Sequence, residues 1–218
     1  MSVTYPEPND MPTTINEVTN FKCKRTAPSG KEYEIESNNS MYPDSDYWLD
    51  CLFSGSTAND NPLPAAEGNN LNKLLYNPTG AQGSEILKLW FKLPDTITLD
   101  KIRMFNQIKI EDFKVYRDPI SFDDDIAGLL LGARGTEIAN IENGLGSSNA
   151  WKEYTMTNTS AESKQFMIVV SSDGWKSSPP SFLQIREMQF ISAAPTLSPP
   201  QVTFPSSPIE EENATVGV

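Results

Sequence analysis

The sequence contains no histidine among its 218 residues. Imidazole is the side chain that most often moves protons and binds metals near neutral pH, because its pKa lies in that range. Its absence excludes serine–histidine triads, imidazole metal sites and imidazole proton shuttles. Serine–lysine pairs, carboxylate pairs and metal sites built from Asp and Glu are left open.

The sequence is also poor in cysteine. It has only Cys23 and Cys51, which are too few for the disulfide framework of a small secreted domain. The two residues can pair, but we expect buried thiols instead. They therefore do not decide the redox compartment.

Long hydrophobic runs are missing as well. No apolar run is long enough to cross a bilayer. Residues 1–14, MSVTYPEPNDMPTT, have neither the basic segment nor the apolar segment of a signal peptide. We therefore expect a chain made in the cytoplasm of its host without a signal peptide.

Positive charge is scarce, with 17 Lys and Arg against 29 Asp and Glu and a net charge of -12. Without a basic field the chain cannot release counterions from a nucleic-acid backbone, and it is repelled by an anionic membrane surface. The composition thus argues against both partners, and we expect neither. Hydrophobic residues make up 38% of the chain, and low hydrophobicity with a large net charge predicts that part of it lies outside a packed core.

Three zones follow one another along the chain. Residues 1–32 are polar and contain four prolines, which predicts an extended N-terminal arm with a first strand at Glu17 to Lys24. Residues 33–192 hold nearly all of the periodic hydrophobicity. Residues 193–218 are rich in Pro and Ser and contain no Lys or Arg, so we expect a C-terminal tail that cannot bury enough surface to order itself.

The middle zone has the period-two alternation of β-strands. Residues 85–93, EILKLWFKL, place apolar side chains on one face, whereas residues 164–172, KQFMIVVSS, carry them on both faces, which predicts burial on both sides. In residues 182–191, FLQIREMQFI, the step from Ile185 to Met188 breaks the period and predicts a β-bulge. Gly, Pro, Asn and Ser clusters separate these runs, as is typical of a β-sandwich or jelly roll. In residues 85–93 the apolar face consists of Leu87, Leu89, Phe91 and Leu93. In residues 164–172 one face carries Phe166, Ile168 and Val170, and the other carries Met167 and Val169.

Residues 99–118, LDKIRMFNQIKIEDFKVYRD, combine two such runs with cations on one side. We interpret this stretch as a wall of the domain, with an apolar inner face and a cationic outer face that meets solvent or a neighbouring molecule. The predicted core side chains are Ile102, Met104, Phe113 and Val115, and the predicted outer cations are Lys101, Arg103, Lys114 and Arg117.

Residues 122–146 depart from the β pattern. This stretch begins with three aspartates, of which Asp123 or Asp124 can cap a short helix. We predict a long inserted loop, and long loops in compact domains are usually functional.

The strings LPDTITLDKIRMFNQIKIEDFKVYRD, WKEYTM, KQFMIVVSSDGW and LQIREMQF, preceded by CLFSGSTAND, resemble in order and spacing the discoidin or F5/8 type C module. The resemblance covers about residues 46–192. It implies an all-β, antiparallel β-sandwich of the galactose-binding-like jelly-roll type, here with extended N- and C-terminal arms. In that family, loops at one end of the sandwich bind sugars, lipid headgroups or proteins, and most members are not enzymes.

The same resemblance implies a possible structural calcium, held by the loop that begins at Ser54 and includes Ser56, together with Glu187. The family often has Asp-Gly where this sequence has Ser54-Gly55. Calcium prefers several oxygen ligands with more than one negative charge, so this departure weakens the expectation.

Aromatic residues in the loops are the candidates for sugar binding, because the C–H faces of sugars stack on aromatic rings. The candidate ligand-binding residues are Tyr47, Trp48, Trp175 and Lys176. Trp48 and Trp175 can instead close the ends of a sandwich core, as large aromatic residues often do, and we favour that role for Trp48. Three consecutive aspartates cannot readily converge on one ion, and no pair of acids stands out as catalytic, so we predict no enzyme activity.

Two functions fit these observations. The first is a structural subunit of a virus particle, such as a phage capsid, tail or fibre component, whose N- and C-terminal arms contact neighbouring subunits. It would act outside the cell without a signal peptide, because lysis releases it. The alternative is a free-standing carbohydrate-binding or adhesion module whose partners are glycans.

Overall fold

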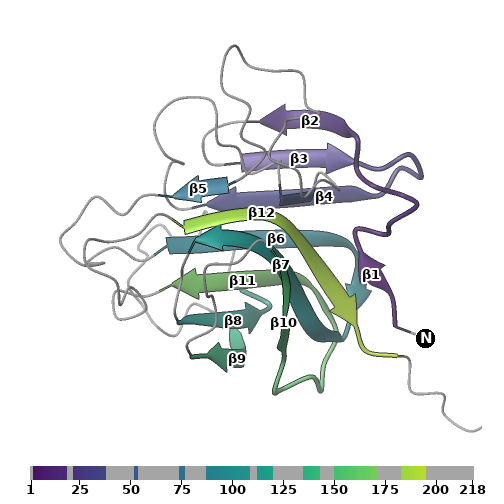
Figure 1. The fold of residues 1–218 in the computed structure, drawn as a ribbon. Helices are drawn as coiled ribbons and strands as arrows, with labels where there is room; N and C mark the ends of the chain where they lie inside the picture. The colour runs from purple at the N-terminus through teal and green to yellow at the C-terminus, as the bar shows by residue number, and fades with distance from the viewer. Residues whose placement is uncertain are drawn as a thin grey trace, which may run out of the picture.

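The computed structural model describes residues 2–18, 22–37, 52–53, 74–76, 87–108, 112–119, 135–142, 150–170 and 183–194. These residues form two antiparallel sheets that pack face to face (Figure 1). The predicted fold class, an all-β antiparallel sandwich, is confirmed. Within these ranges no helix has the length and apolarity that crossing a bilayer requires.

The smaller sheet has five strands. Its order is β1 (Thr4–Tyr5), β12 (Leu183–Ser192), β7 (Leu99–Ile108) and β10 (Ala150–Thr155), and β5 (Leu74–Tyr76) also pairs with β12. The larger sheet has seven strands in the order β2 (Thr14–Val18), β3 (Lys22–Thr26), β4 (Glu32–Ser37), β6 (Leu87–Ile97), β11 (Ser163–Val170), β8 (Phe113–Arg117) and β9 (Thr136–Ile141).

The core lies between the two sheets and takes every second residue of the central strands. The apolar faces predicted for β6, β7 and β8 are buried there, including Phe91, Ile102 and Val115. Phe53, from the short turn Leu52–Phe53, is 0% exposed. Its ring centroid lies 5.4 Å from that of Tyr33 and 6.1 Å from those of Phe91 and Phe190. Burying such a ring contributes about 1.5–3 kcal/mol, so this turn is firmly attached to the core.

Strand β11 is buried on both faces, as its two-sided hydrophobicity predicted. Phe166, Ile168 and Val170 face the main core. Met167 and Val169 are each 1% exposed and belong to a second cluster with Trp90 and Tyr116 on the opposite face of the sheet. The larger sheet therefore has an apolar layer on each side.

The bulge predicted in β12 is present. The register between β12 and β7 shifts around Gln184, Ile185 and Glu187. This shift lets both Ile185 and Met188 point into the core although three positions separate them. A strict alternation would have turned one of them outward.

The N-terminal residues are part of both sheets. The sequence predicted an arm with one strand at Glu17 to Lys24, whereas the structure has β1 in the smaller sheet and the β2–β3 pair at the edge of the larger one. β3 then pairs along its whole length with β4. Over the described residues this segment is therefore integrated into the sandwich, because its backbone groups are used in the two ladders.

The stretch predicted as a loop over residues 122–146 contains a strand. β9 pairs with β8 and forms an edge of the larger sheet. A register shift between Val115 and Tyr116 accompanies the burial of both Ile138 and Ala139. The aspartates proposed as a helix cap lie outside the described residues, as does the predicted tail beyond residue 194.

Candidate functional site

The two ends of β6 define the two ends of the sandwich. At the Leu87 end, β11 finishes with Val170 opposite Leu87, and β4 finishes with Ser37 opposite Leu89. At the Ile97 end, β11 begins with Ser163 opposite Ile97. Because Thr98 alone joins β6 to β7, β7 runs back and finishes at the Leu87 end, where β12 begins beside it.

Most of the residues predicted from sequence to bind a ligand lie outside the described residues. These are Tyr47, Trp48, Ser54, Ser56, Trp175 and Lys176. The first four follow β4, which finishes at the Leu87 end, and the last two connect β11 to β12, whose flanking ends are also there. The described strand ends that flank these segments, the end of β4, the end of β11 and the beginning of β12, therefore lie at one end of the sandwich.

Glu187 is the one predicted site residue that the structure describes. It follows the bulge in β12, lies opposite Phe105 of β7 and is 1% exposed. Gln184, three residues earlier, pairs with the last residue of β7, so Glu187 lies close to the Leu87 end. A buried carboxylate at this position is expensive to desolvate unless other groups compensate its charge.

The described residues alone do not build the calcium site that the family resemblance implies. Glu187 supplies one carboxylate, and within the described ranges no three His, Cys, Asp or Glu side chains gather as metal ligands would. Calcium takes six to eight oxygen ligands. The calcium site therefore remains a prediction that depends on Ser54 and Ser56.

An aromatic pair near the Leu87 end was missed by the sequence reasoning. Trp151, the second residue of β10, lies directly opposite Phe105, and their ring centroids are 5.7 Å apart in an edge-on arrangement. The Arg103 guanidinium lies over the Trp151 ring, 4.8 Å from its centroid. Its Nε lies 3.1 Å from Glu153 Oε1, and its Nη1 donates to Gln189 Oε1 at 3.2 Å.

This cluster combines half-buried aromatic rings with a guanidinium, a carboxylate and an amide on the outer face of the smaller sheet. The cluster arises because two pairs of outward-facing residues lie opposite each other on β10 and β7. These are Trp151 with Phe105 and Glu153 with Arg103. The alternation of WKEYTM was the signal from which it could have been found, since Tyr154 and Met156 are buried and Trp151 and Glu153 are on the other face.

Other outward cations pair with carboxylates across neighbouring strands. Each such exposed pair contributes about 0–1 kcal/mol to stability. The main effect of these pairs is therefore to balance the charge on the outer faces of the sheets. This supports the interpretation of residues 99–118 as a wall. The pairs are Lys22–Glu36 at 3.0 Å, Lys24–Glu32 at 2.9 Å, Lys92–Glu34 at 3.1 Å, Lys101–Glu153 at 3.4 Å and Lys114–Glu137 at 3.1 Å.

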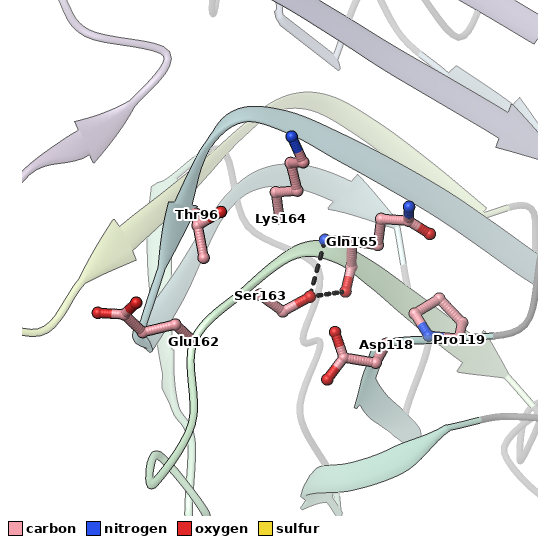
Figure 2. Close-up of a pocket in the computed structure, with 7 residues that line it drawn as sticks. All are labelled: Thr96, Asp118, Pro119, Glu162, Ser163, Lys164 and Gln165. Atoms are coloured by element: carbon pink, nitrogen blue, oxygen red, sulfur yellow. Dashed lines mark hydrogen bonds between the residues drawn. The ribbon is translucent and has the colours of Figure 1, made fainter.

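A hollow of about 370 Å³ lies at the Ile97 end (Figure 2). It is bordered by the end of β6, the residues after β8 and the beginning of β11. Its lining consists of Thr96, Asp118, Pro119, Glu162, Ser163, Lys164 and Gln165. No residue predicted from the sequence as a site residue belongs to it.

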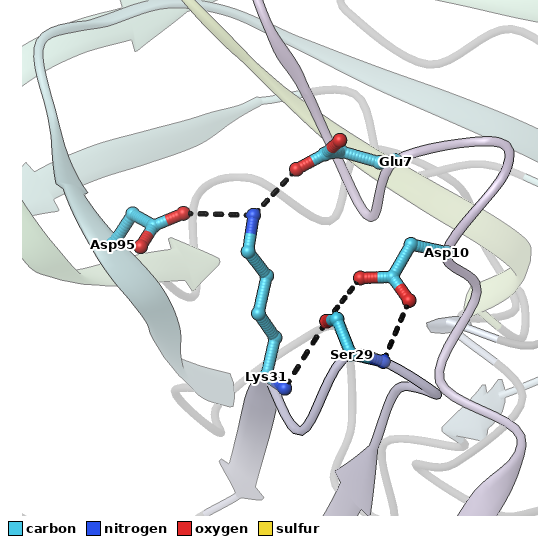
Figure 3. A network of polar contacts seen from close by, with 5 residues as sticks. All are labelled: Glu7, Asp10, Ser29, Lys31 and Asp95. Carbon is cyan, nitrogen blue, oxygen red and sulfur yellow. Dashed lines mark hydrogen bonds and ion pairs between the residues drawn. The ribbon is translucent and has the colours of Figure 1, made fainter.

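A polar network at the same end attaches the N-terminal segment to the sandwich (Figure 3). Lys31 Nζ lies between Glu7 Oε1 at 2.5 Å and Asp95 Oδ2 at 3.1 Å. These contacts raise the pKa of Lys31 well above its usual range, chiefly through the hydrogen bond to Glu7. Asp10 accepts hydrogen bonds from the side chain and the backbone N–H of Ser29, and the side-chain bond is the main cause that lowers the pKa of Asp10.

No family model and no curated protein matches the sequence. Several solved structures are similar to the chain. The family 32 carbohydrate-binding module of Clostridium perfringens NanJ, in complex with galactose, is 11% identical with a TM-score of 0.47, over 73% of this chain and 93% of that one. The module CpGH89CBM32-5 of the same organism, in complex with GalNAc-β-1,3-galactose, is 10% identical with a TM-score of 0.48, over 74% and 95%.

A fucolectin from striped bass serum is a further structure of this kind. It is 13% identical with a TM-score of 0.45, over 73% of this chain and 46% of that one. The chain resembles carbohydrate-binding modules of family 32 in its fold.

Proposed function

We propose that this chain is a non-catalytic carbohydrate-binding module that holds glycans at the Leu87 end of the sandwich. The observation that carries the proposal is the strand order. The segment after β4 and the segment between β11 and β12 both depart from the Leu87 end. The predicted ligand-binding residues Tyr47, Trp48, Trp175 and Lys176 belong to these two segments.

The chemistry of these residues suits a sugar. An aromatic ring offers a flat apolar face for the C–H groups of a pyranose, while charged and amide groups exchange hydrogen bonds with its hydroxyls. Trp175 and Lys176 supply one group of each kind. Near the same end, Trp151 with Glu153 and Gln189 adds a described aromatic ring flanked by hydrogen-bond acceptors.

A glycan array followed by titration tests the proposal. The full chain is screened first, and then galactose and GalNAc-β-1,3-galactose are titrated, since solved structures of similar fold were determined with these sugars. We expect binding to at least one glycan class and its loss in Trp175→Ala. Ile15→Ala, which removes a side chain that is 38% exposed on the edge strand β2, is the control and retains binding.

Two results would contradict the proposal. One is the absence of binding to every glycan class on the array. The other is binding that Trp175→Ala and Ile15→Ala leave equally intact, because the glycan would then be held somewhere other than the proposed end.

A role as a structural subunit of a virus particle is a second proposal, and it rests on the composition of residues 193–218. A segment that orders only on contact can wrap around a neighbouring subunit. Over the described residues, the N-terminal segment is instead paired within this chain, so the tail is the better candidate for such a contact. Deletion of residues 193–218 should leave the sandwich folded and abolish assembly; a truncated chain that still assembles removes this role.

A further inference from the structure

We propose that the hollow at the Ile97 end is a second ligand site, which takes a single neutral or ammonium-bearing saccharide ring. It lies at the opposite end of the sandwich from the glycan site proposed above and involves none of its residues. Its volume of about 370 Å³ falls within the range of about 300–1,000 Å³ that is typical of small-molecule sites.

An irregularity of β6 creates the hollow. Lys92 lies opposite Gln165 of β11, and Ile97 lies opposite Ser163. Four residues of β6, numbers 93–96, therefore face the single residue Lys164. Pro94 lies in this stretch and has no N–H to donate to a ladder, so the pairing of the two strands is interrupted beside the hollow.

Hydrogen bonds to backbone groups connect the strands that border the hollow. Ser163 Oγ donates to the carbonyl of Gln165 at 3.0 Å and accepts the Gln165 N–H at 2.9 Å. The Asp118 N–H donates to the same carbonyl at 3.0 Å, and Arg117 Nη1 donates to the carbonyl of Ala161 at 3.3 Å. These bonds attach the end of β8 to the beginning of β11, so a ligand would meet a surface that is already ordered.

The position of Asp118 is fixed by close backbone packing. Its φ of 47° is unusual for a residue other than glycine. Gly135 lies against it so closely that a Cβ there would be 2.3 Å from the carbonyl oxygen of Arg117 and 2.6 Å from that of Asp118. In Figure 2 the Asp118 carboxylate points toward Ser163, while Glu162 points away from it.

The N-terminal network holds the outer side of the same irregular stretch. Asp95 lies next to Thr96, which lines the hollow, and its carboxylate lies 3.1 Å from Lys31 Nζ. Lys31 is in turn paired with Glu7. The wall that contains Thr96 is therefore restrained from both sides, by β11 and by the N-terminal segment.

The lining selects a hydroxyl-rich ligand without negative charge. Asp118 is 61% exposed at its side chain and offers acceptors, while Thr96, Lys164 and Gln165 offer donors. Each sugar hydroxyl both donates and accepts, so it can satisfy both kinds of group. The lining itself carries two carboxylates against one ammonium. Arg117, whose side chain is 13% exposed and whose Nε lies 3.7 Å from Asp118 Oδ2, offsets part of the Asp118 charge from behind. The exposed excess of carboxylates disfavours phosphates and acidic sugars. Pro119 is the one lining residue whose side chain has no polar group.

Amide-resolved NMR titration of the ¹⁵N-labelled full chain tests the proposal. The probes are galactose, galactosamine and galacturonate, which share one ring and differ in charge. We expect the amides of Asp118, Ser163 and Gln165 to shift with galactose and galactosamine at millimolar concentrations, and not with galacturonate. Asp118→Asn should weaken this binding about tenfold, because it removes a charged hydrogen-bond acceptor.

Two variants make the result specific. Asn tolerates a positive φ better than most residues, so Asp118→Asn should fold like the parent chain. Glu17→Gln, which removes a carboxylate from the exposed strand β2, is the matched control and should bind as the parent does. Shifts at the hollow should persist in Trp175→Ala, since that residue belongs to the other proposed site.

Three outcomes overturn the proposal. The first is that no sugar shifts the amides of the hollow, even where others in the chain respond. The second is that galacturonate binds there as well as galactose. The third is that Asp118→Asn and Glu17→Gln behave alike. Shifts confined to the hollow, by contrast, support this site and count against the glycan site at the Leu87 end.

Discussion

Replacing Phe53 with alanine perturbs both the core and the segment that carries several predicted ligand-binding residues. The Phe53 ring is fully buried and makes three aromatic contacts at 5.4–6.1 Å. Truncation of a buried Phe to Ala costs about 3–5 kcal/mol, and each aromatic pair adds about 0.5–1.5 kcal/mol beyond the buried area. We therefore expect a loss near the upper end, about 4–5 kcal/mol.

Urea unfolding, monitored by tryptophan fluorescence, measures this loss of stability. For a slope of about 2 kcal/mol per molar urea, a loss of about 4 kcal/mol lowers the midpoint by about 2 M. The control Ile15→Ala removes an apolar side chain that is 38% exposed and should change stability by less than about 0.5 kcal/mol. A loss below about 1 kcal/mol for Phe53→Ala would refute the packing described for this turn.

The same variant has a functional consequence. Leu52 and Phe53 are the described residues between β4 and β5, and Tyr47, Trp48, Ser54 and Ser56 lie in the stretches on either side of them. Removing the ring takes away the core contact that anchors this part of the chain. We expect Phe53→Ala to weaken glycan binding even at temperatures where the variant is still folded, and unchanged affinity in the folded variant contradicts this expectation.

Three further perturbations test the Ile97 end and its surroundings. Lys31→Met should cost about 1 kcal/mol, because its ion pairs are partly exposed and screened by solvent, and it should speed amide hydrogen exchange in residues 2–10; unchanged exchange would mean that this network does not hold the N-terminal segment. Ser29→Ala should raise the pKa of Asp10, measured by ¹³C NMR of its carboxyl group, because the hydrogen bonds that lower it in the parent come from Ser29. The stabilisation linked to the lowered pKa is present when the pH is above the pKa of Asp10 in the unfolded chain, and it is lost as the pH falls through the pKa of Asp10 in the folded chain. A pKa of Asp10 that does not change in Ser29→Ala contradicts this assignment. Gly135→Ala and Gly30→Ala both place a side chain at positive φ, but only at Gly135 does the Cβ meet backbone atoms, so Gly135→Ala should lower the free energy of unfolding by about 1–3 kcal/mol more; equal losses would show that the Gly135 contact is not tight.

Local patterns in the sequence were sufficient to predict the central strands. The alternation in residues 85–93 predicted which face of β6 is buried. Apolar residues on both faces of residues 164–172 predicted that β11 is buried on both sides. The break in the period before Met188 predicted the bulge in β12. These features depend on neighbours within one strand, so a single segment reveals them.

Pairings between distant segments could not be predicted in this way. β1 pairs with β12 across almost the whole chain, and β9 pairs with β8 inside a stretch that begins with three aspartates. A strand of two residues has no periodicity to detect, and β9 buries the consecutive residues Ile138 and Ala139, so it does not show a period of two. The strand contacts come from long-range hydrogen bonding, which no local pattern encodes.

The same difference between local patterns and long-range pairing applies to the candidate sites. The loop aromatics could be selected from their composition, and they lie outside the described residues. The Trp151 cluster and the hollow beside Asp118 require the register of β7 with β10 and of β6 with β11. A shift of one residue would turn Trp151 inward, so these sites follow only from the paired sheets.

Calorimetric titration of the full chain and of Trp175→Ala with GalNAc-β-1,3-galactose and with the best glycan from the array tests the proposed function most directly. We expect binding by the parent chain and at least a tenfold lower affinity for Trp175→Ala, which corresponds to about 1.4 kcal/mol, with Ile15→Ala unchanged. Equal affinities for the parent and Trp175→Ala, or no heat of binding with any glycan, would contradict a carbohydrate-binding site at the Leu87 end.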